Sequence, residues 1–334
     1  MKLIKPRKLN IGERVGIISP SSSIKKFPIR LRRSVECLQK ELKVEVVLGS
    51  YVDSEDGYSA GSLLQRVADI HSFFKDPSIK AIMCSSGGYS ANTLLDHLDY
   101  SLIKNNPKIF LGFSDITVLA NAITKMTGMI TFHGPTLLPS FGPFEGIDSS
   151  TKQSLIKAIQ TSEPIGDLAS ASKYSDESLF WDKEDIRPST YKPAVPYSVL
   201  HESGIVEGTL FGGNINTLGM LIGTKYLPNL KNSILFLEDG DTNLARVERD
   251  LQYLDQSNIF SQLKGVLVGR FIGSENSKSK IFDFFKLIGR KYDIPIIINL
   301  DIGHTKPILT LPIGGRIKID SINGIVTVVD SAVI

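Results

Sequence analysis

Cysteine, concentrated charge and long apolar runs are all scarce in this sequence of 334 residues. Its two cysteines, Cys37 and Cys84, cannot form a disulfide framework and lack the spacing of metal ligands, which fits a reducing cytoplasm. The net charge is only +3 and the basic residues are scattered, whereas nucleic-acid binders usually carry a concentrated basic stripe. The apolar runs are far shorter than the roughly 20 residues that cross a bilayer. We therefore expect a soluble cytoplasmic protein that has neither nucleic acid nor a membrane as its partner.

Several motifs that would indicate a bound metal or cofactor are also missing. There is no His-Glu-x-x-His, no Cys-x-x-Cys and no histidine pair at helical spacing, so a zinc site would need scattered ligands. Neither Gly-x-Gly-x-x-Gly nor Gly-x-x-x-x-Gly-Lys-Ser/Thr is present, which removes the usual support for a dinucleotide or a nucleoside triphosphate. The sequence therefore predicts no metal site and no organic cofactor.

The composition and periodicity indicate a globular α/β protein. Hydrophobic residues make up 42% and charged residues 22% of the chain, and its length suits two domains at roughly 150 residues each. Short apolar runs alternate with amphipathic helical patterns, which is typical of an open parallel sheet, and the tail alternates as antiparallel strands do. The expected strands are 15–18, 44–48, 79–83, 109–111, 129–132, 233–237, 265–268, 294–300, 315–320 and 324–329, and the expected helices are 31–42, 63–74, 92–98, 116–123, 217–222, 244–254 and 281–288.

Residues 166–204 differ from the rest of the chain. They are rich in Ser, Asp, Lys and Pro, and they contain the only tryptophan, Trp181, directly after Phe180. Such a long irregular segment is either a linker or a functional lid. Linkers rarely carry a Phe-Trp pair, which favours a lid, although Trp181 could instead fill an interface between domains. We accordingly divide the chain into an N-terminal domain (1–165), a linker or substrate lid (166–204) and a C-terminal domain (205–334).

The stretch 108–125 predicts a strand, a tight turn and the start of a helix. The apolar run 109–111 leads into Gly112-Phe113-Ser114-Asp115, and apolar residues then recur at helical spacing. A serine on such a turn lies at the carboxyl end of a strand, where the free amides of a helix start can stabilise negative charge. Alternatively, Ser114 or Asp115 merely caps the helix.

Glu238 and His304 also follow apolar strands directly. Ligands of open α/β sheets bind at the carboxyl ends of the strands, so Ser114, Glu238 and His304 could meet there. A serine becomes a strong nucleophile when a histidine removes its proton, and a carboxylate orients that histidine. His133 is the main rival for the base role because it also follows a strand. His71 and His97 lie in helical patterns, where a structural or solvent-facing role is more common, and His201 lies in the irregular segment.

Taken together, several short pieces of the sequence resemble the LD-carboxypeptidase family of serine peptidases, which includes muropeptide LD-carboxypeptidases and microcin C self-immunity peptidases. Each piece is short, but their order and spacing are specific. The pieces are Gly16-Ile17-Ile18-Ser19-Pro20-Ser21, Ser86-Gly87-Gly88-Tyr89, Gly112-Phe113-Ser114-Asp115, Phe132-His133-Gly134-Pro135, Gly212-Gly213-Asn214, Leu237-Glu238-Asp239 and Gly303-His304.

The resemblance implies a role for each of these positions. Ser114 would be the nucleophile, His304 the general base and then acid, and Glu238 the carboxylate that orients His304. The amides of Gly88 and Asp115 would form the oxyanion hole. The substrate would be bound by Gly87, Trp181 and Asn214.

The resemblance also implies a Rossmann-like, parallel-sheet N-terminal domain, a smaller β-rich α/β C-terminal domain, an active site in the cleft between them, and a homodimer. The turn has Ile116 where the α/β-hydrolase motif Gly-x-Ser-x-Gly has its second glycine, so that other fold is a poorer match.

The family leaves two branches open. Muropeptide enzymes release a terminal D-alanine during cell-wall recycling, whereas self-immunity enzymes cut the amide between an aspartyl peptide and a nucleotide and so confer antibiotic resistance. The length of 166–204 and the presence of Trp181 favour the second branch, because an aromatic ring there would stack on the base. A third possibility, of a different class, is a binding protein that recognises a peptidyl or nucleotide ligand without cleaving it.

Overall fold

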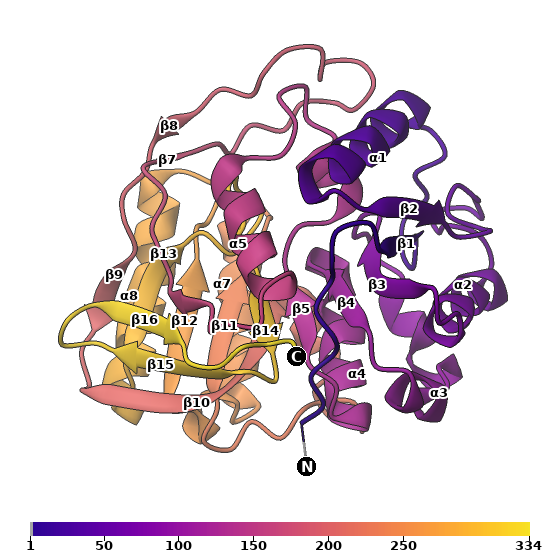
Figure 1. Ribbon diagram of the computed structural model, residues 1–334. Coiled ribbons are helices and arrows are strands. Elements are labelled where there is room, and N and C mark those ends of the chain that lie inside the picture. Colours follow the sequence, from indigo (N-terminus) through magenta and orange to yellow (C-terminus); the bar gives the residue numbers. More distant parts are fainter. Residues whose placement is uncertain (1–2) are drawn as a thin grey trace.

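The computed structural model describes residues 3–334, which form two β-sheets with helices packed around them (Figure 1). The first sheet has the strand order β14-β5-β4-β3-β1-β2, and its five N-terminal strands are parallel. Parallel neighbours need long crossover connections, which here contain helices. The elements are β1 (Arg14–Ile18), α1 (Pro28–Leu42), β2 (Glu45–Leu48), α2 (Leu63–Lys75), β3 (Ile79–Cys84), η1 (Ala91–His97), α3 (Tyr100–Asn105), β4 (Ile109–Gly112), η2 (Ser114–Ile116), α4 (Thr117–Thr127), β5 (Thr131–His133), η3 (Leu137–Phe141), α5 (Ser149–Ile159) and β14 (Leu311–Ile313).

The second sheet has eight strands in the order β6-β16-β15-β10-β11-β12-β13-β9. Strand β10 changes partner along its length, because its first half pairs antiparallel with β15 and its second half pairs parallel with β11. The elements are β6 (Gly166–Asp167), β9 (Ser198–His201), β10 (Ile205–Asn214), α6 (Ile215–Gly219), β11 (Ile234–Glu238), α7 (Leu244–Gln256), η4 (Phe260–Gln262), β12 (Gly265–Gly269), α8 (Glu275–Tyr292), β13 (Ile296–Leu300), β15 (Arg316–Asp320) and β16 (Ile325–Val328), with β7 (Lys173–Tyr174) and β8 (Lys192–Pro193) as a separate pair.

The two sheets are held together where β10 passes α4. A Cβ atom on Gly213 would lie 2.4 Å from Oγ1 of Thr117, and one on Gly212 would lie 1.9 Å from the carbonyl oxygen of Phe236. Both glycines have positive φ, so only glycine gives this backbone path without strain. Asn121 of α4 donates from Nδ2 to the carbonyl of Gly212 at 2.8 Å. The close approach fixes the end of β10 against the helix that follows β4.

Strand β14 also crosses between the two halves of the chain. It comes from the C-terminal part of the sequence, yet it pairs antiparallel with β5, with Leu311 opposite His133. The first sheet is therefore completed by a strand that lies beyond the whole parallel part of the second sheet in sequence.

The structure confirms the predicted α/β class and places every predicted strand, with ends shifted by a few residues. The helix expected over 217–222 begins earlier, at Ile215, because the Asn214 side chain accepts a hydrogen bond from the amide of Thr217 and caps it. The helix expected over 92–98 is the 3₁₀ segment η1. Helices α3 and α5 and the pairing of β14 with β5 were not predicted, and the irregular segment supplies the edge strands β6 and β9.

The segment 166–204 is fastened to the start of α1, and Figure 1 shows its loop beside that helix. Helix α1 has no side-chain cap of its own, but Asp182 accepts hydrogen bonds from the amides of Ile29 and Arg30 at 3.0 and 2.7 Å. Asp185 is buried and pairs with the guanidinium groups of Arg30 and Arg33, each at 2.5 Å. These contacts satisfy the free amides of the helix start and neutralise Arg30, which is buried as well.

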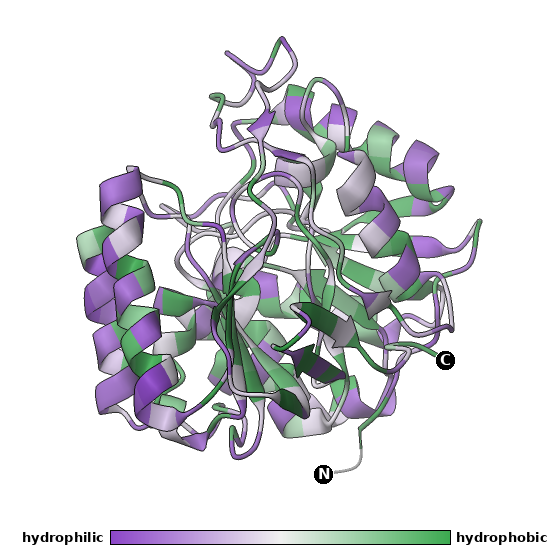
Figure 2. Ribbon diagram, turned by 90° about the vertical axis from the view of Figure 1, so that its left-hand side faces the viewer, coloured by the Kyte–Doolittle hydropathy of each residue, from purple (hydrophilic) through white to green (hydrophobic). Residues whose placement is uncertain are grey.

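Hydrophobic residues gather on the strands, whereas the outward sides of the helices are hydrophilic (Figure 2). The buried apolar side chains of both sheets form one cluster, so the core is shared. Within residues 3–334, no helix combines the length and apolarity that crossing a membrane would demand.

Replacing Asp185 with alanine should lower the free energy of unfolding by about 3–5 kcal/mol, because Arg30 would stay buried without its counter-charge. The side chains of Arg30 and Asp185 are only 4% and 3% exposed. The matched control is Glu45→Ala, which removes an ion pair to Arg14 whose side chains are 51% and 62% exposed, and should cost about 1 kcal/mol or less. Urea denaturation measures both values, and equal losses would contradict the importance of the buried pair.

Candidate active site

Ser114 lies on a tight turn directly after β4, as predicted. Its φ is +63°, which is uncommon for a residue other than glycine and typical of functional turns. The turn also needs Gly112, because a Cβ there would lie 2.7 Å from a methyl carbon of Ile116. Neither η2 nor α4 has a side-chain cap, so the alternative in which Ser114 or Asp115 caps this helix is wrong. The turn therefore holds the Ser114 hydroxyl at the carboxyl end of β4, where it does not cap the helix and can contact other side chains.

The structure brings Ser114, His304 and Glu238 into one hydrogen-bonded chain. His304 Nε2 lies 3.1 Å from Ser114 Oγ, and His304 Nδ1 lies 2.6 Å from Glu238 Oε2. Glu238 ends β11 and is completely buried, whereas the His304 side chain is 26% exposed in the cleft. Gly240 lies against the imidazole, since a Cβ there would be 2.5 Å from its Cγ. Ser114 follows a strand of the first sheet, Glu238 ends a strand of the second, and His304 lies on the loop between β13 and β14. His304 is 190 residues from Ser114 and 66 residues from Glu238 in the sequence.

The partners of His304 determine where its proton lies. A carboxylate only accepts hydrogen bonds, so Nδ1 carries the proton of the neutral ring and Nε2 is free to accept one from the Ser114 hydroxyl. Burial by itself lowers the pKa of His304, but the charge of Glu238, its hydrogen bond and the charge of Asp239 outweigh burial and raise this pKa above its ordinary value. The arrangement thus favours taking up a proton from Ser114.

The other histidines do not contact Ser114. His133 is buried and its Nε2 lies 2.7 Å from the carbonyl oxygen of Ile302, and burial lowers its pKa. His71 Nε2 accepts a hydrogen bond from the amide of Asp99 in a structural role. His97 is exposed in η1, and His201 lies in β9. Among the histidines that the structure describes, His304 is the one within hydrogen-bonding distance of Ser114.

Of the two predicted oxyanion residues, Asp115 directly follows Ser114, and Gly88 lines the same cavities as Ser114. A Cβ on Gly87 would lie 2.9 Å from Ser114 Oγ and 3.3 Å from the amide nitrogen of Asp115, so the 87–88 turn packs directly against the hydroxyl. Gly88 has a φ of +150°, and a Cβ there would lie 2.2 Å from Oγ of Ser22. Only glycine therefore fits at either position without displacing its neighbours.

The side chain of Asp115 has a structural task that the sequence did not reveal. It is buried and accepts hydrogen bonds from Ser21 Oγ at 2.5 Å and from the amide of Ala91 at 2.8 Å. These bonds tie together the loops after β1, β3 and β4. The Asp115 amide is thereby held beside Ser114.

Two hollows meet at Ser114 and His304, and both of these residues line each hollow. One, of about 400 Å³, extends to Trp181, whose ring packs edge-on against Phe27 at 5.1 Å and beneath the Arg30 guanidinium at 4.8 Å. Trp181 therefore both seals the segment 166–204 against α1 and faces the cavity.

The other hollow, of about 550 Å³, contains Asn214 and Arg246. The Asn214 side-chain oxygen is occupied by the amide and hydroxyl of Thr217, so its amide nitrogen is the group left for a ligand.

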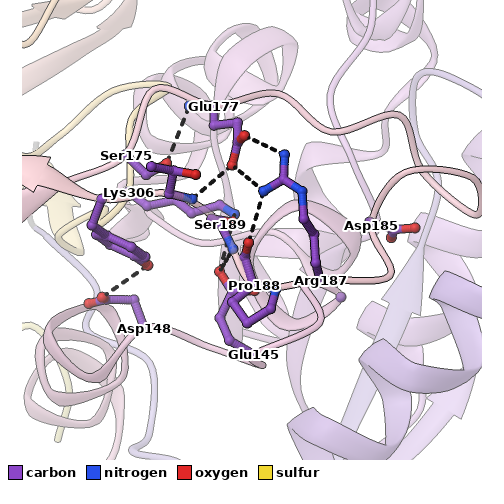
Figure 3. A network of polar contacts seen from close by, with 12 residues as sticks. Glu145, Asp148, Ser175, Glu177, Asp185, Arg187, Pro188, Ser189 and Lys306 are labelled. Atoms are coloured by element: carbon purple, nitrogen blue, oxygen red, sulfur yellow. Dashed lines mark hydrogen bonds and ion pairs between the residues drawn. The ribbon is translucent and has the colours of Figure 1, made fainter.

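The wall of the hollow that extends to Trp181 contains a polar network that the sequence did not reveal (Figure 3). Lys306 donates to Ser189 Oγ at 2.6 Å and lies 3.7 Å from Glu145, and burial lowers its pKa. Arg187 pairs with Glu177 at 2.7 Å. The position of Lys306, two residues after His304, was the one sequence feature that could have indicated this network. Among the described residues, no group of three or more His, Cys, Asp or Glu side chains is arranged to hold a metal ion.

Replacing Glu238 with glutamine should lower the pKa of His304, because the negative charge that favours the imidazolium is removed while the shape is kept. NMR titration of the labelled histidine rings measures this. In the wild type we expect His304 to titrate above its ordinary value of about 6.5, and His71 and His133 below it. The control is Glu275→Gln on the exposed start of α8. A His304 pKa below the ordinary value in the wild type would contradict this description of the site.

Comparisons with known proteins agree with this fold. A family model described as the LD-carboxypeptidase N-terminal domain matches residues 15–134, and one described as the LD-carboxypeptidase C-terminal domain matches residues 207–319. The microcin C7 self-immunity protein MccF of Escherichia coli is 34% identical over 93% of this chain and 92% of its own length, and the murein tetrapeptide carboxypeptidase of Pseudomonas aeruginosa is 29% identical over 88% and 89%. A solved MccF structure superposes with a TM-score of 0.91 at 32% identity, covering 99% of this chain and 100% of the other. The chain therefore belongs to the LD-carboxypeptidase family of serine peptidases.

Proposed function

We propose that this chain hydrolyses an amide bond in a small peptide conjugate through an acyl-enzyme on Ser114. The observation that carries the proposal is the unbroken chain of contacts from Ser114 through His304 to the buried Glu238. We assign Ser114 as nucleophile, His304 as general base and then acid, and Glu238 as the group that orients and charges the imidazole.

The first half of the reaction forms the acyl-enzyme. His304 Nε2 takes the proton from Ser114 Oγ as that oxygen attacks the carbonyl carbon of the amide. The resulting oxyanion is stabilised by the amides of Gly88 and Asp115, and each such preorganised donor is worth roughly 3 kcal/mol in the transition state. His304 then gives its proton to the leaving nitrogen, the carbon–nitrogen bond breaks, and an ester on Ser114 remains.

The second half releases the acid. A water molecule loses a proton to His304 as it attacks the ester carbon, and the bond to Ser114 Oγ breaks while His304 returns the proton to that oxygen. The enzyme ends in its starting state, and the products are a carboxylic acid and an amine. Each proton moves through Nε2, which is the ring nitrogen that faces Ser114.

For the substrate we favour a peptidyl or aminoacyl nucleotide. Trp181 faces the cavity beside Ser114, where its ring could stack on a base. Solved MccF structures hold aspartyl sulfamoyl adenosine and glutamyl sulfamoyl guanosine, and an MccF variant with tryptophan replaced by phenylalanine is known with adenosine monophosphate. The proposal includes microcin C type immunity, and hence antibiotic resistance, in a cytoplasmic homodimer whose segment 166–204 acts as the substrate lid between the domains 1–165 and 205–334.

The alternative substrate is a muropeptide, from which the chain would release terminal D-alanine in cell-wall recycling. A relative named murein tetrapeptide carboxypeptidase supports it. The charges of the cavity wall do not favour a nucleotide over a muropeptide. Arg30, Arg187 and Lys306 each lie beside a carboxylate, so they present little free positive charge to a phosphate. A binding protein without activity is the alternative of another class, but such a protein would have no evident use for the Ser114–His304 contact.

Ser114→Ala should lower turnover by about 10⁴-fold or more, because it removes the atom that becomes acylated. Mass spectrometry of wild type and variant, each incubated with a tetrapeptide muropeptide and with an aspartyl adenylate conjugate, measures the products. Release of the nucleotide portion by wild type only would support the favoured substrate, whereas release of D-alanine by wild type only would support the alternative. Equal turnover by both proteins would show that Ser114 is not the nucleophile.

Trp181→Ala should weaken binding of the nucleotide conjugate by about 1–3 kcal/mol, because the stacking surface is lost, and should affect a muropeptide much less. Trp181→Phe is the matched control, since it keeps a ring that can stack. Calorimetric titrations with the Ser114→Ala protein measure binding without cleavage. Unfolding of each variant is followed in parallel, because Trp181 also packs on Phe27. Equal losses for both ligands would remove the stacking assignment.

A further inference from the structure

The ring of His133 lies where the three segments that carry the triad come together. It packs edge-on against Phe236 at 4.8 Å and against Phe113 at 6.1 Å, measured between ring centroids. Its Nε2 lies 2.7 Å from the carbonyl oxygen of Ile302. No hydrogen bond joins His133 to Ser114 among the described contacts, so it has no part in the proton transfers themselves.

The three neighbours of His133 each lie one or two residues before a triad member. Phe113 directly precedes Ser114, Phe236 precedes Glu238 by two positions on β11, and Ile302 precedes His304 by two. In a strand, residues two apart point to the same side, so Phe236 and Glu238 face the same way. Any shift of the His133 ring would therefore be passed to all three segments.

His133 is itself rigidly placed. It is only 1% exposed, and its backbone lies in the first sheet between β4 and β14, opposite Gly112 on one side and Leu311 on the other. The ionisable groups that face it are Glu238 and His304. Burial lowers its pKa, and because a carbonyl oxygen only accepts hydrogen bonds, Nε2 carries a proton and donates it to Ile302.

We propose that His133 is a positioning residue that holds the His304 segment at the distance from Ser114 that proton transfer needs, through its hydrogen bond to the Ile302 carbonyl. This inference rests on the proposed function of the triad. His133 belongs to the first sheet and Ser114 follows one of its strands, whereas Glu238 ends a strand of the second sheet and His304 lies on the loop that leads from β13 to β14. The His133–Ile302 bond is thus a direct polar link between the two halves of the site.

The test compares His133→Gln with His133→Asn. Both remove the ring and keep an amide, but only the glutamine nitrogen reaches the place of Nε2, since asparagine is one methylene shorter. His133→Phe keeps the ring and loses the donor, and it serves if the asparagine variant fails to fold. Thermal unfolding checks that each protein is folded. The readouts are the His304 pKa by NMR, and kcat and KM with whichever of the two conjugates the wild type cleaves.

We expect the asparagine or phenylalanine variant to lose about 10- to 100-fold in kcat with little change in KM, because small displacements of catalytic groups have effects of about this size. Its His304 pKa should fall, because a displaced imidazole lies farther from Glu238. The glutamine variant should recover most of both quantities. An unchanged His304 pKa in a folded variant that lacks the donor would overturn the proposal, as would a glutamine variant no better than asparagine.

The NMR result does not depend on turnover. If the wild type cleaves neither conjugate while the His304 pKa follows the expected order, the proposed reaction fails and the positioning role stands. If the wild type cleaves a conjugate and the variants behave alike, the positioning role fails and the proposed reaction stands.

Discussion

The arrangement of the candidate active site depends on one carboxylate, that of Glu238, which has no access to solvent. Removing a charged group from water is costly unless hydrogen bonds and an opposite charge replace the water. Here one carboxylate oxygen is 2.6 Å from His304 Nδ1, and the other has no hydrogen-bond partner among the described atoms. The Glu238–His304 pair is most stable when the imidazole is positively charged. Burial of Glu238 beside His304 therefore increases the proton affinity of His304. This higher proton affinity is useful only if a donor lies at the other ring nitrogen, where Ser114 is found.

Bringing these groups together requires two sheets to be held in a fixed relation. Ser114 follows a strand of the first sheet and Glu238 ends a strand of the second, whereas His304 lies on the loop between β13 and β14. The join depends on a backbone approach that a side chain would prevent, at Gly213 against Thr117, and on the hydrogen bond from Asn121 to the Gly212 carbonyl. A shared apolar core packs around this junction between the sheets. Strand β14, from the C-terminal part of the chain, adds to the junction because it pairs with β5 of the first sheet. Rigidity of this kind keeps a 3.1 Å contact between residues 190 positions apart.

Much of this arrangement could be predicted from local patterns. Apolar runs located the strands, and the rule that ligands bind at the carboxyl ends of parallel strands made Ser114, Glu238 and His304 candidates for one site. The choice of these three as a triad came from the resemblance to the LD-carboxypeptidase family. The sequence pattern alone left His133 as an alternative to His304 for the base. The alternation of residues along a strand does not show that the His133 ring contacts the Ile302 carbonyl instead of Ser114. The ion pair of Asp185 with Arg30 and the bond from Ser21 to Asp115 were also missed. Their partners lie 155 and 94 residues apart, and nothing in the local sequence marks them as a pair.

The pairing of β14 with β5 has a consequence for the order in which the protein is assembled during synthesis. Strand β5 leaves the ribosome well before β14, and the parallel strands of the second sheet are made in between. Until β14 arrives, the sheet that carries Ser114 has an open edge next to His133, with unpaired backbone groups that could attract other strands. The nascent first half therefore carries an unpaired sheet edge until β14 is made. The same delay keeps Ser114 apart from His304, so their contact forms only when the late part of the chain folds back onto the early part.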